Sequence, residues 1–537
     1  MVLLILLMRP KYNTFPIPSL YQRRIMAGTY SKLGLLVVVV CLIQTVMTLG
    51  TKFQLVEQLD KVPEGWTRGE KPSSSTVLKL RLAVDQPNLI ALEQDVVDIS
   101  TPGHPRYGQH MKRDELKERL RPGPAVSSKI VSWLNAENIS RESTQVDGNW
   151  FTFKATVLQA ERMLNTKFSY FRHEASGATV IRTLGYSVPE DIHPHVLLIQ
   201  PTTRFGNMNT QRSLPIEEPI EATQADLAAP CGLVVSPDCL REMYGLYGAQ
   251  AKPDPRNRLG ISGFLEQFAR HGDFDEFISR FAYNQTDANF TVVSINGGLN
   301  DENSSLSSTE ASLDVQYSIT LAYNALATYY TTAGRGPLVP DGDQPSANNS
   351  TNEPYLEQLL FLLNLPDDKL PAVLTTSYGE SEQSLPASYA NVTCNLFAQL
   401  GGRGVSVIFS SGDSGPGSSC RTNDGTNRRR FLPGFPASCP FVTGVGATYS
   451  SGPEKATDFS GGGFSDIFAR PDYQHKIVDD YLKNLGNQWK GLYNPKGRGI
   501  PDVAAQGSNF LIRDHGRWLR ISGTRFVSLK PDRSEVC

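Results

Sequence analysis

The chain has 537 residues, of which 39% are hydrophobic and 20% are charged, which is the composition of a globular protein with room for two or three domains. Its 52 basic and 54 acidic side chains give a formal net charge of −2. This balance excludes the basic field that binding nucleic acid requires, so no nucleic-acid partner is expected.

The first 50 residues contain a segment with the features of a secretory signal. Residues 32–50 have a cationic start, an apolar core too short to span a membrane comfortably and a small residue suited to cleavage. Because residues 1–25 are unusual ahead of such a signal, we expect the true start to be Met26. A type II membrane anchor is the alternative. The favoured prediction is a secreted, extracellular protein without stable membrane association.

Glycosylation sequons and cysteines fit an oxidising compartment. Candidate glycosylation sites are Asn138, Asn284, Asn289, Asn303, Asn348, Asn349 and Asn391. Cys231 with Cys239, or Cys420 with Cys439, are near enough in sequence to close short disulfide loops. No cysteine or histidine cluster has zinc-ligand spacing, so a zinc site of that type is not expected.

Residues 51–205 have the pattern of a small α+β domain with an antiparallel sheet. Strand-like segments are predicted at 76–84, 149–155 and 195–201, and helical segments at 88–100, 114–120, 125–138 and 156–168. The next segment, 206–229, is polar, contains prolines and has no period. It is therefore predicted to be an exposed linker and a site of proteolysis.

From residue 230 to 537, apolar strand-like runs alternate with longer helical stretches. The strand-like runs lie at 258–264, 290–296, 372–379 and 404–412. This alternation predicts an α/β domain with a parallel sheet covered on both faces. Residues 334–354 are predicted to be a surface loop that can be glycosylated, and 427–430 a solvated run of charge.

The Gly-Asp-Ser-Gly stretch at 412–415 raises the question of a serine nucleophile at Ser414. A chymotrypsin-like nucleophile needs a β-barrel and a preceding His and Asp, and the α/β pattern contradicts that fold. In a parallel sheet, the strand at 404–412 instead places Asp413 at the carboxyl edge, where the active sites of such sheets lie. Asp413 is therefore the candidate residue.

A second acidic feature lies in the predicted helix at 304–324. Glu310 and Asp314 are four residues apart, so they share one face of this helix. Two like charges at this spacing cost helix stability, and a solvated acidic face with one favourable helix-dipole contact is the structural alternative.

Several segments of this chain resemble, in sequence and in order, those of the sedolisin family, the serine-carboxyl peptidases, and especially of its fungal tripeptidyl-peptidase group. TEASLDVQY at 309–317 is similar to the family's Glu-x-x-x-Asp helix, and SSGDSG at 410–415 to its oxyanion aspartate segment. FPASCPFVTGVGAT at 435–448, GGGFSDIFARPDYQ at 461–474 and GRGIPDVAAQGSNF at 497–510 also resemble family segments. STPGHPRYGQHM at 100–111 resembles the activation prodomain.

The resemblance implies a subtilisin-like catalytic domain preceded by a ferredoxin-like prodomain. Glu310 would be the general base toward a serine, Asp314 would hold and tune Glu310, and Asp413 would donate a hydrogen bond to the oxyanion. An imidazole base is protonated well below pH ~6.5, whereas a carboxylate with a pKa near ~4 still accepts a proton there. The implied enzyme works in acid on peptide or protein substrates, and its own prodomain is a further partner.

Two parts of the family pattern are missing from this chain. The family serine lies in Ser-Gly-Thr-Ser, and here Ser522, Gly523 and Thr524 are followed by Arg525. Ser528 is three residues away and would be displaced by several Å. The resemblance also implies a calcium site near the carboxyl terminus, and its ligand segment is absent from this chain. We expect a truncated and inactive peptidase chain, with 525–537 arising from a retained intron or a misread splice junction.

The leading hypothesis is thus a monomeric acid peptidase that releases tripeptides, in a form that lacks its nucleophile. The alternative is a non-catalytic pseudoenzyme that binds peptides or regulates a protease, and an unrelated surface glycoprotein is a third possibility. The residues leave open the choice between exopeptidase and endopeptidase action.

Overall fold

The computed structural model describes residues 51–523, apart from 60, 63–65, 87, 174–178, 204–219, 224–230, 232, 247–253, 346–349 and 451. The predicted signal with Met26, the sequons at Asn348 and Asn349, and Arg525 lie outside the described residues. In the described part of the chain, none of the helices combines the length and apolar character needed to cross a bilayer.

Residues 53–203, here called the amino-terminal region, form a four-stranded antiparallel sheet in the order β4-β5-β3-β9, with two smaller sheets beside it. Its strands are β1 (Phe53–Gln58), β2 (Trp66–Arg68), β3 (Val77–Val84), β4 (Thr144–Asp147), β5 (Trp150–Thr156), β6 (Ser169–His173), β7 (Thr179–Arg182), β8 (Gly185–Pro189) and β9 (Val196–Gln200). Its helices are α2 (Leu89–Ser100), α3 (Arg113–Arg119), α4 (Pro124–Ala136) and α5 (Val157–Met163), with short 3-10 turns η1 (Arg141–Ser143) and η2 (His193–His195).

The alternation of apolar side chains explains this fold. Leu80, Leu82 and Val84 of β3 point to one face of the sheet, where they form a core with α4 and α5. Thr156 starts α5 with a capping box, since its hydroxyl accepts from the Gln159 amide and the Gln159 side chain accepts from the Thr156 amide. The antiparallel α+β prediction for this region is confirmed.

Residues 231–523, the carboxyl-terminal region, are built on an eight-stranded sheet in the order β12-β13-β11-β14-β16-β18-β19, with β22 also paired to β18. All pairs in it are parallel except β18 with β19. The strands of this sheet are β11 (Arg258–Gly263), β12 (Phe290–Ile295), β13 (Leu326–Thr332), β14 (Val373–Thr376), β16 (Ser406–Ser410), β18 (Thr443–Tyr449), β19 (Lys455–Ala456) and β22 (Val503–Gln506).

Smaller strand pairs and the helices complete the region. The other strands are β15 (Glu380–Ser381), β17 (Gly434–Phe435), β20 (Gly463–Ala469), β21 (Gly497–Ile500), β23 (Phe510–Asp514) and β24 (Arg517–Ile521). The helices are α7 (Pro237–Met243), α8 (His271–Phe281), α9 (Thr309–Leu321), α10 (Tyr355–Asn364), α11 (Ala387–Gly402) and α12 (His475–Leu485), with 3-10 turns η3 (Glu382–Ser384) and η4 (Asp472–Gln474).

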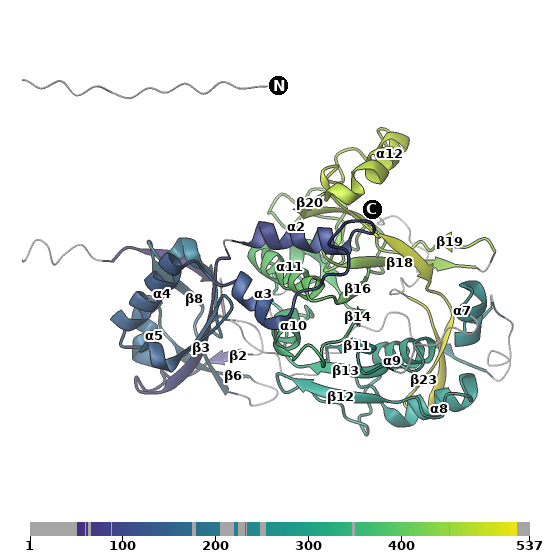
Figure 1. Ribbon diagram of the computed structural model, residues 1–537, viewed down its shortest axis with the longest axis horizontal. Coiled ribbons are helices and arrows are strands. Elements are labelled where there is room, and N and C mark those ends of the chain that lie inside the picture. The colour runs from purple at the N-terminus through teal and green to yellow at the C-terminus, as the bar shows by residue number, and fades with distance from the viewer. Residues whose placement is uncertain are drawn as a thin grey trace, which may run out of the picture. The chain divides into compact units, whose positions relative to one another are not determined.

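Helices cover both faces of the large sheet, as Figure 1 shows for α8 and α9 on one side and α10 and α11 on the other. Neighbouring residues of β13 show the alternation, because Tyr329 is buried against the α8 and α9 side and Tyr330 against the α10 side. The prediction of an α/β domain with a parallel sheet covered on both faces is confirmed.

The predicted linker and one predicted disulfide need correction. Residues 220–221 of the linker form a strand, β10 (Ile220–Glu221), which pairs with β24, so this part is not an unstructured connection. Cys231 pairs with Cys239 as expected, but Cys439 pairs with Cys394 of α11 rather than with Cys420. The prediction for Cys420 with Cys439 was wrong because it used distance along the chain, whereas the fold places α11 against the segment before β18.

The two regions are in contact through α2 and α11. Leu92 and Val96 of α2 lie in the same core as α10 and α11, and the Met111 amide donates to the Gly402 carbonyl at 2.8 Å. A Cβ added to Gly401 would meet Val96 Cγ1 at 3.3 Å, so a larger residue at this position would require the Val96 side chain to shift slightly.

Candidate active site

The candidate acidic pair lies at the amino-terminal end of α9. Ser308 is the N-cap position, Glu310 is in the first turn and Asp314 follows one turn later. A carboxylate in the first turn interacts favourably with the helix dipole. The side chain of Glu310 is half-buried and that of Asp314 is buried, so the structural alternative of a solvated acidic face does not describe Asp314.

Burial changes the acidity of Asp314. Its pKa is raised well above the ordinary aspartate value, first by loss of hydration and second by the neighbouring charge of Glu310. The Ser377 hydroxyl donates to Asp314 Oδ1 at 2.6 Å and opposes part of this shift. Because one hydrogen bond does not offset burial, Asp314 holds its proton at pH values where a solvated aspartate is ionised.

Two tyrosines lie close enough to the acidic pair to feel its charge. Tyr329 of β13 and Tyr378, which follows β14, are both buried, and their pKa values are raised by burial and by the charges of Asp314 and Glu310. The Tyr329 hydroxyl donates to the Gln267 carbonyl at 2.9 Å. The acidic pair, Glu310 and Asp314, therefore lies beside two tyrosine hydroxyls that stay neutral.

The opposite side of α9 is fixed by polar contacts with the β23–β24 hairpin. Buried Asp514 pairs with Arg270 at 2.9 Å and accepts hydrogen bonds from the Ser308 amide and the Ser312 hydroxyl. Gln316 exchanges two hydrogen bonds with the backbone of Arg513. These contacts hold the first turn of α9, and with it Glu310, in one position.

Asp413 follows β16, at the same carboxyl edge of the sheet at which β14 ends. Its side chain is buried, at 4% exposed, whereas Ser414 is exposed. Gly412 has a φ of 101°, which turns the chain sharply after the strand. The choice of Asp413 over Ser414 as the candidate residue stays a prediction.

A backbone network fixes the turn that carries Asp413. The Gly461 amide donates to the Gly412 carbonyl at 2.7 Å, the Gly415 amide to Phe459 at 2.9 Å, and the Gly462 amide to Gly415 at 3.1 Å. A Cβ added to Gly461 would meet the Ser411 carbonyl at 2.1 Å, so the two loops approach closely only with glycine at 461.

The described chain ends near this edge. Gly523 donates to the Gly507 carbonyl at 2.7 Å, and the Ser522 hydroxyl accepts from the Asn509 amide at 2.5 Å. Residue 507 follows β22, which pairs with β18 beside β16. Sequence reasoning missed Ser377, although its position near the carboxyl end of the strand-like run at 372–379 was a usable signal.

The remaining expectations concern the calcium site and the glycosylation sites. Among the residues that the structure describes, no group of three or more His, Cys, Asp or Glu side chains is arranged to hold a metal ion, and the calcium site implied by the resemblance stays a prediction. The described sequon asparagines are all exposed at the surface: Asn138, Asn284, Asn289, Asn303 and Asn391.

Comparison with known proteins gives consistent similarities. Residues 64–205 match the family model of the Pro-kumamolisin activation domain. The chain is 52% identical over 484 residues to the probable tripeptidyl-peptidase SED3 of Trichophyton verrucosum, covering 90% of this chain and 82% of that protein. It is 49% identical over 494 residues to the probable tripeptidyl-peptidase SED2 of Arthroderma benhamiae, covering 90% and 83%.

A solved Pseudomonas sedolisin, a serine-carboxyl proteinase complexed with two molecules of pseudo-iodotyrostatin, is 20% identical with a TM-score of 0.37. The match covers 55% of this chain and 77% of that one.

Proposed function

The chain belongs to the sedolisin family, in its fungal tripeptidyl-peptidase group, and we propose that its carboxyl-terminal region is built to hydrolyse peptide bonds in acid and to release tripeptides from the amino terminus of a polypeptide. The observation that carries this proposal is the carboxyl pair on α9, half-buried at Glu310 and buried at Asp314, where burial and the charge of Glu310 favour the protonated form of Asp314. Such a pair supplies a base and a proton store where histidine is already protonated.

We assign Glu310 to take the proton of the attacking hydroxyl and Asp314 to position Glu310 and share its proton. Asp413, buried at the end of β16, donates a hydrogen bond to the oxygen of the substrate carbonyl as negative charge develops on it. Such a donor needs a protonated carboxyl, which again favours acid.

This chain carries Arg525 where the family motif has serine. We therefore propose that the chain as written binds peptides without hydrolysing them, and that its second candidate function is that of a pseudoenzyme which binds peptides or regulates a protease. The arginine favours this second function because a guanidinium is no nucleophile and stays protonated.

We also propose that residues 51–205 act as a cleavable prodomain and that the protein is secreted. The match of 64–205 to an activation domain supports the first point. The disulfides Cys231–Cys239 and Cys394–Cys439 and the exposed sequons support the second.

An assay of three full-length chains tests the function: the chain as written, Arg525→Ser, and Arg525→Ser combined with Glu310→Gln. The substrates are one peptide with a free amino terminus and its acetylated form, at pH ~4 and pH ~7. We expect no turnover by the first chain, tripeptide release in acid by the second from the free peptide only, and loss of that release in the third. Turnover by the chain as written, or equal cleavage of the acetylated peptide, contradicts the assignment.

A further inference from the structure

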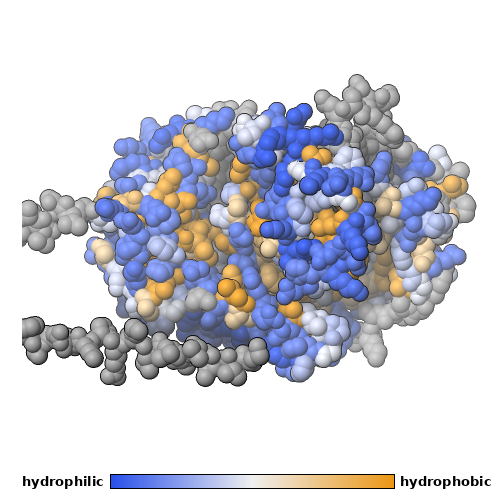
Figure 2. All heavy atoms as spheres, turned by 90° about the horizontal axis from the view of Figure 1, so that it is seen from above, coloured by the Kyte–Doolittle hydropathy of each residue, from blue (hydrophilic) through white to orange (hydrophobic). Residues whose placement is uncertain are grey.

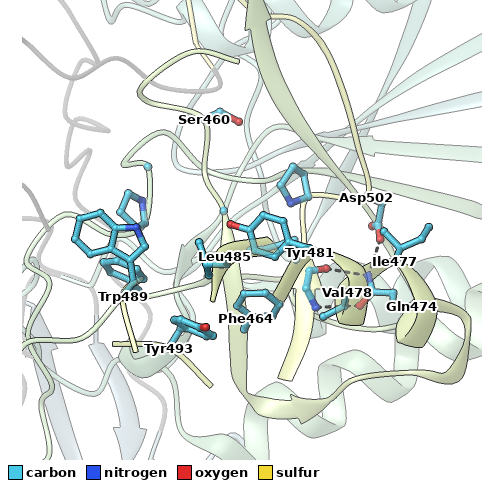
Figure 3. Close-up of a pocket in the computed structure, with 18 of the residues that line it drawn as sticks. Ser460, Phe464, Gln474, Ile477, Val478, Tyr481, Leu485, Trp489, Tyr493 and Asp502 are labelled. Carbon is cyan, nitrogen blue, oxygen red and sulfur yellow. Dashed lines mark hydrogen bonds between the residues drawn. The ribbon is translucent and has the colours of Figure 1, made fainter. Parts of the chain in front are cut away.

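A cavity of about 700 Å³ lies beside α12 and is lined mainly by apolar and aromatic side chains. Figure 3 shows Phe464, Tyr481, Leu485 and Trp489 gathered around it. The ring of Phe464 is 5.2 Å from that of Tyr493, and the ring of Trp489 is 5.8 Å from that of Phe431. This volume accommodates several apolar side chains at once.

The cavity is continuous with the turn that carries Asp413. Gly415 and Pro416 line it, and they begin two residues after Asp413. Its second wall includes Gly462, whose amide donates to Gly415 at 3.1 Å. The turn that carries Asp413 is thus also a wall of the cavity.

The polar groups at one end of the cavity already have partners. Gln474 donates to the Gly499 carbonyl at 2.9 Å and to Asp502 at 3.1 Å, and it accepts from the Gly499 amide (Figure 3). Asp502 also pairs with buried Arg498. Since these groups are occupied, the free surface of the cavity offers apolar contact rather than charge.

Two of the apolar residues of α12 that line the cavity are exposed. Ile477 is 74% exposed and Tyr481 is 54% exposed, and of the eleven residues in α12 only Val478 is buried. Figure 1 shows α12 at the periphery, and Figure 2, which looks down on that side, shows hydrophobic residues exposed among hydrophilic ones. Among the described residues, all those that line the cavity belong to the carboxyl-terminal region.

We propose that this cavity binds the segment of the polypeptide substrate that follows the scissile bond, through its apolar side chains. The inference rests on the proposed function, because an enzyme that removes tripeptides has only three residues of substrate before the bond. Further binding contacts must come from the leaving segment, and this cavity adjoins the Asp413 turn. Interactions with non-reacting parts of a substrate contribute to catalysis when they position the reacting carbonyl.

The binding test uses the full-length chain as written, in which no turnover is needed. A tryptophan-free peptide of apolar residues is titrated against it while emission from Trp489 is followed, with a matched polar peptide as comparison. We expect saturable binding of the apolar peptide and a blue shift that disappears in Trp489→Phe, while calorimetry still detects binding by that variant.

Substitution of the exposed α12 residues makes the test specific. Ile477→Ala combined with Tyr481→Ala is expected to weaken apolar peptide binding about tenfold or more. The matched control is Tyr283→Ala, since Tyr283 is 78% exposed and does not line the cavity. Equal binding of apolar and polar peptides, or unchanged binding by the double variant, overturns the proposal. A concentration-dependent shift without peptide would identify a second copy of the chain as the occupant instead.

Kinetics separate this inference from the proposed function. In the Arg525→Ser background, kcat/KM is compared for a substrate with a long apolar leaving segment and for a short reporter with the same tripeptide. The ratio of the two is expected to fall about tenfold in Tyr481→Ala and to stay constant in Tyr283→Ala. If this kcat/KM ratio is unchanged in Tyr481→Ala while tripeptide release is intact, the proposed role of the cavity is wrong and the proposed function stands. Absence of release with specific peptide binding intact contradicts the proposed function alone.

Discussion

Helix α9 is mostly buried in the molecule, whereas helix α12 is mostly exposed. Eight of the thirteen residues of α9 are buried, and its polar side chains bond to the β23–β24 hairpin and to Ser377. Only one of the eleven residues of α12 is buried, and its apolar side chains face a cavity. The difference teaches that this fold holds the proposed proton-exchanging pair in a packed helix and leaves apolar side chains of α12 exposed beside the cavity.

The largest effect is expected where the anchoring of α9 is broken. Asp514→Ala leaves the Arg270 guanidinium buried without its partner and removes the acceptor for the Ser308 amide, which should lower the free energy of unfolding by about 3–5 kcal/mol. Chemical denaturation measures this loss.

The matched control is Asp479→Ala on α12, where the carboxylate that pairs with Arg470 is 64% exposed. This substitution is expected to lower the free energy of unfolding by no more than about 1 kcal/mol. Equal losses in the two variants would remove the distinction between the helices.

A smaller, pH-dependent effect is expected from Asp314→Asn. The folded pKa of Asp314 is raised, so its contribution to stability is fully present below the unfolded pKa of ~3.9 and is lost as pH rises through the folded pKa. The unsubstituted chain should lose up to about 1.4 kcal/mol per pH unit over that window from this group, and the variant should lose less. Melting curves between acid and neutral pH measure the difference, and parallel pH dependences would contradict it.

Ser377→Ala tests the contribution of the hydrogen bond between Ser377 and Asp314. The Ser377 hydrogen bond lowers the pKa of Asp314, so its removal should raise that pKa further and destabilise the chain by about 1 kcal/mol at neutral pH. Ser377→Thr keeps the donor and should restore most of the loss. A Thr variant as unstable as the Ala variant would indicate a packing role for Ser377.

The smallest change is expected at α12. Ile477→Ala alters a side chain that is 74% exposed, so the free energy of unfolding should change by no more than about 0.5 kcal/mol. The same variant should still weaken apolar peptide binding. A large loss of stability would mean that α12 is a packing helix rather than a binding surface.

The sequence was most informative where local pattern decides the structure. Apolar runs predicted β11, β12, β14 and β16, and the spacing of Glu310 and Asp314 placed both on one helical face. Strand β13 was less evident because its sequence, LATYYTT, lacks an aliphatic run, although every residue from Tyr330 onward is buried.

Contacts between distant segments were not predictable from one sequence. Asp514 pairs with Arg270 across 244 residues, and Cys439 pairs with Cys394 rather than with the nearer Cys420. The cavity beside α12 was also missed, because exposed aromatic residues in a segment of helical pattern resemble ordinary surface residues until the opposing wall is known.

The proton on Asp314 is the central physical claim, and carboxyl titration by infrared spectroscopy with isotope-labelled aspartate tests it on the chain as it stands. The account predicts a protonated aspartate signal that persists well above the ordinary aspartate pKa of ~3.9 and is absent from Asp314→Asn. A signal that titrates in the ordinary range, or that remains unchanged in Asp314→Asn, would contradict the claim that α9 holds a buried proton for acid catalysis.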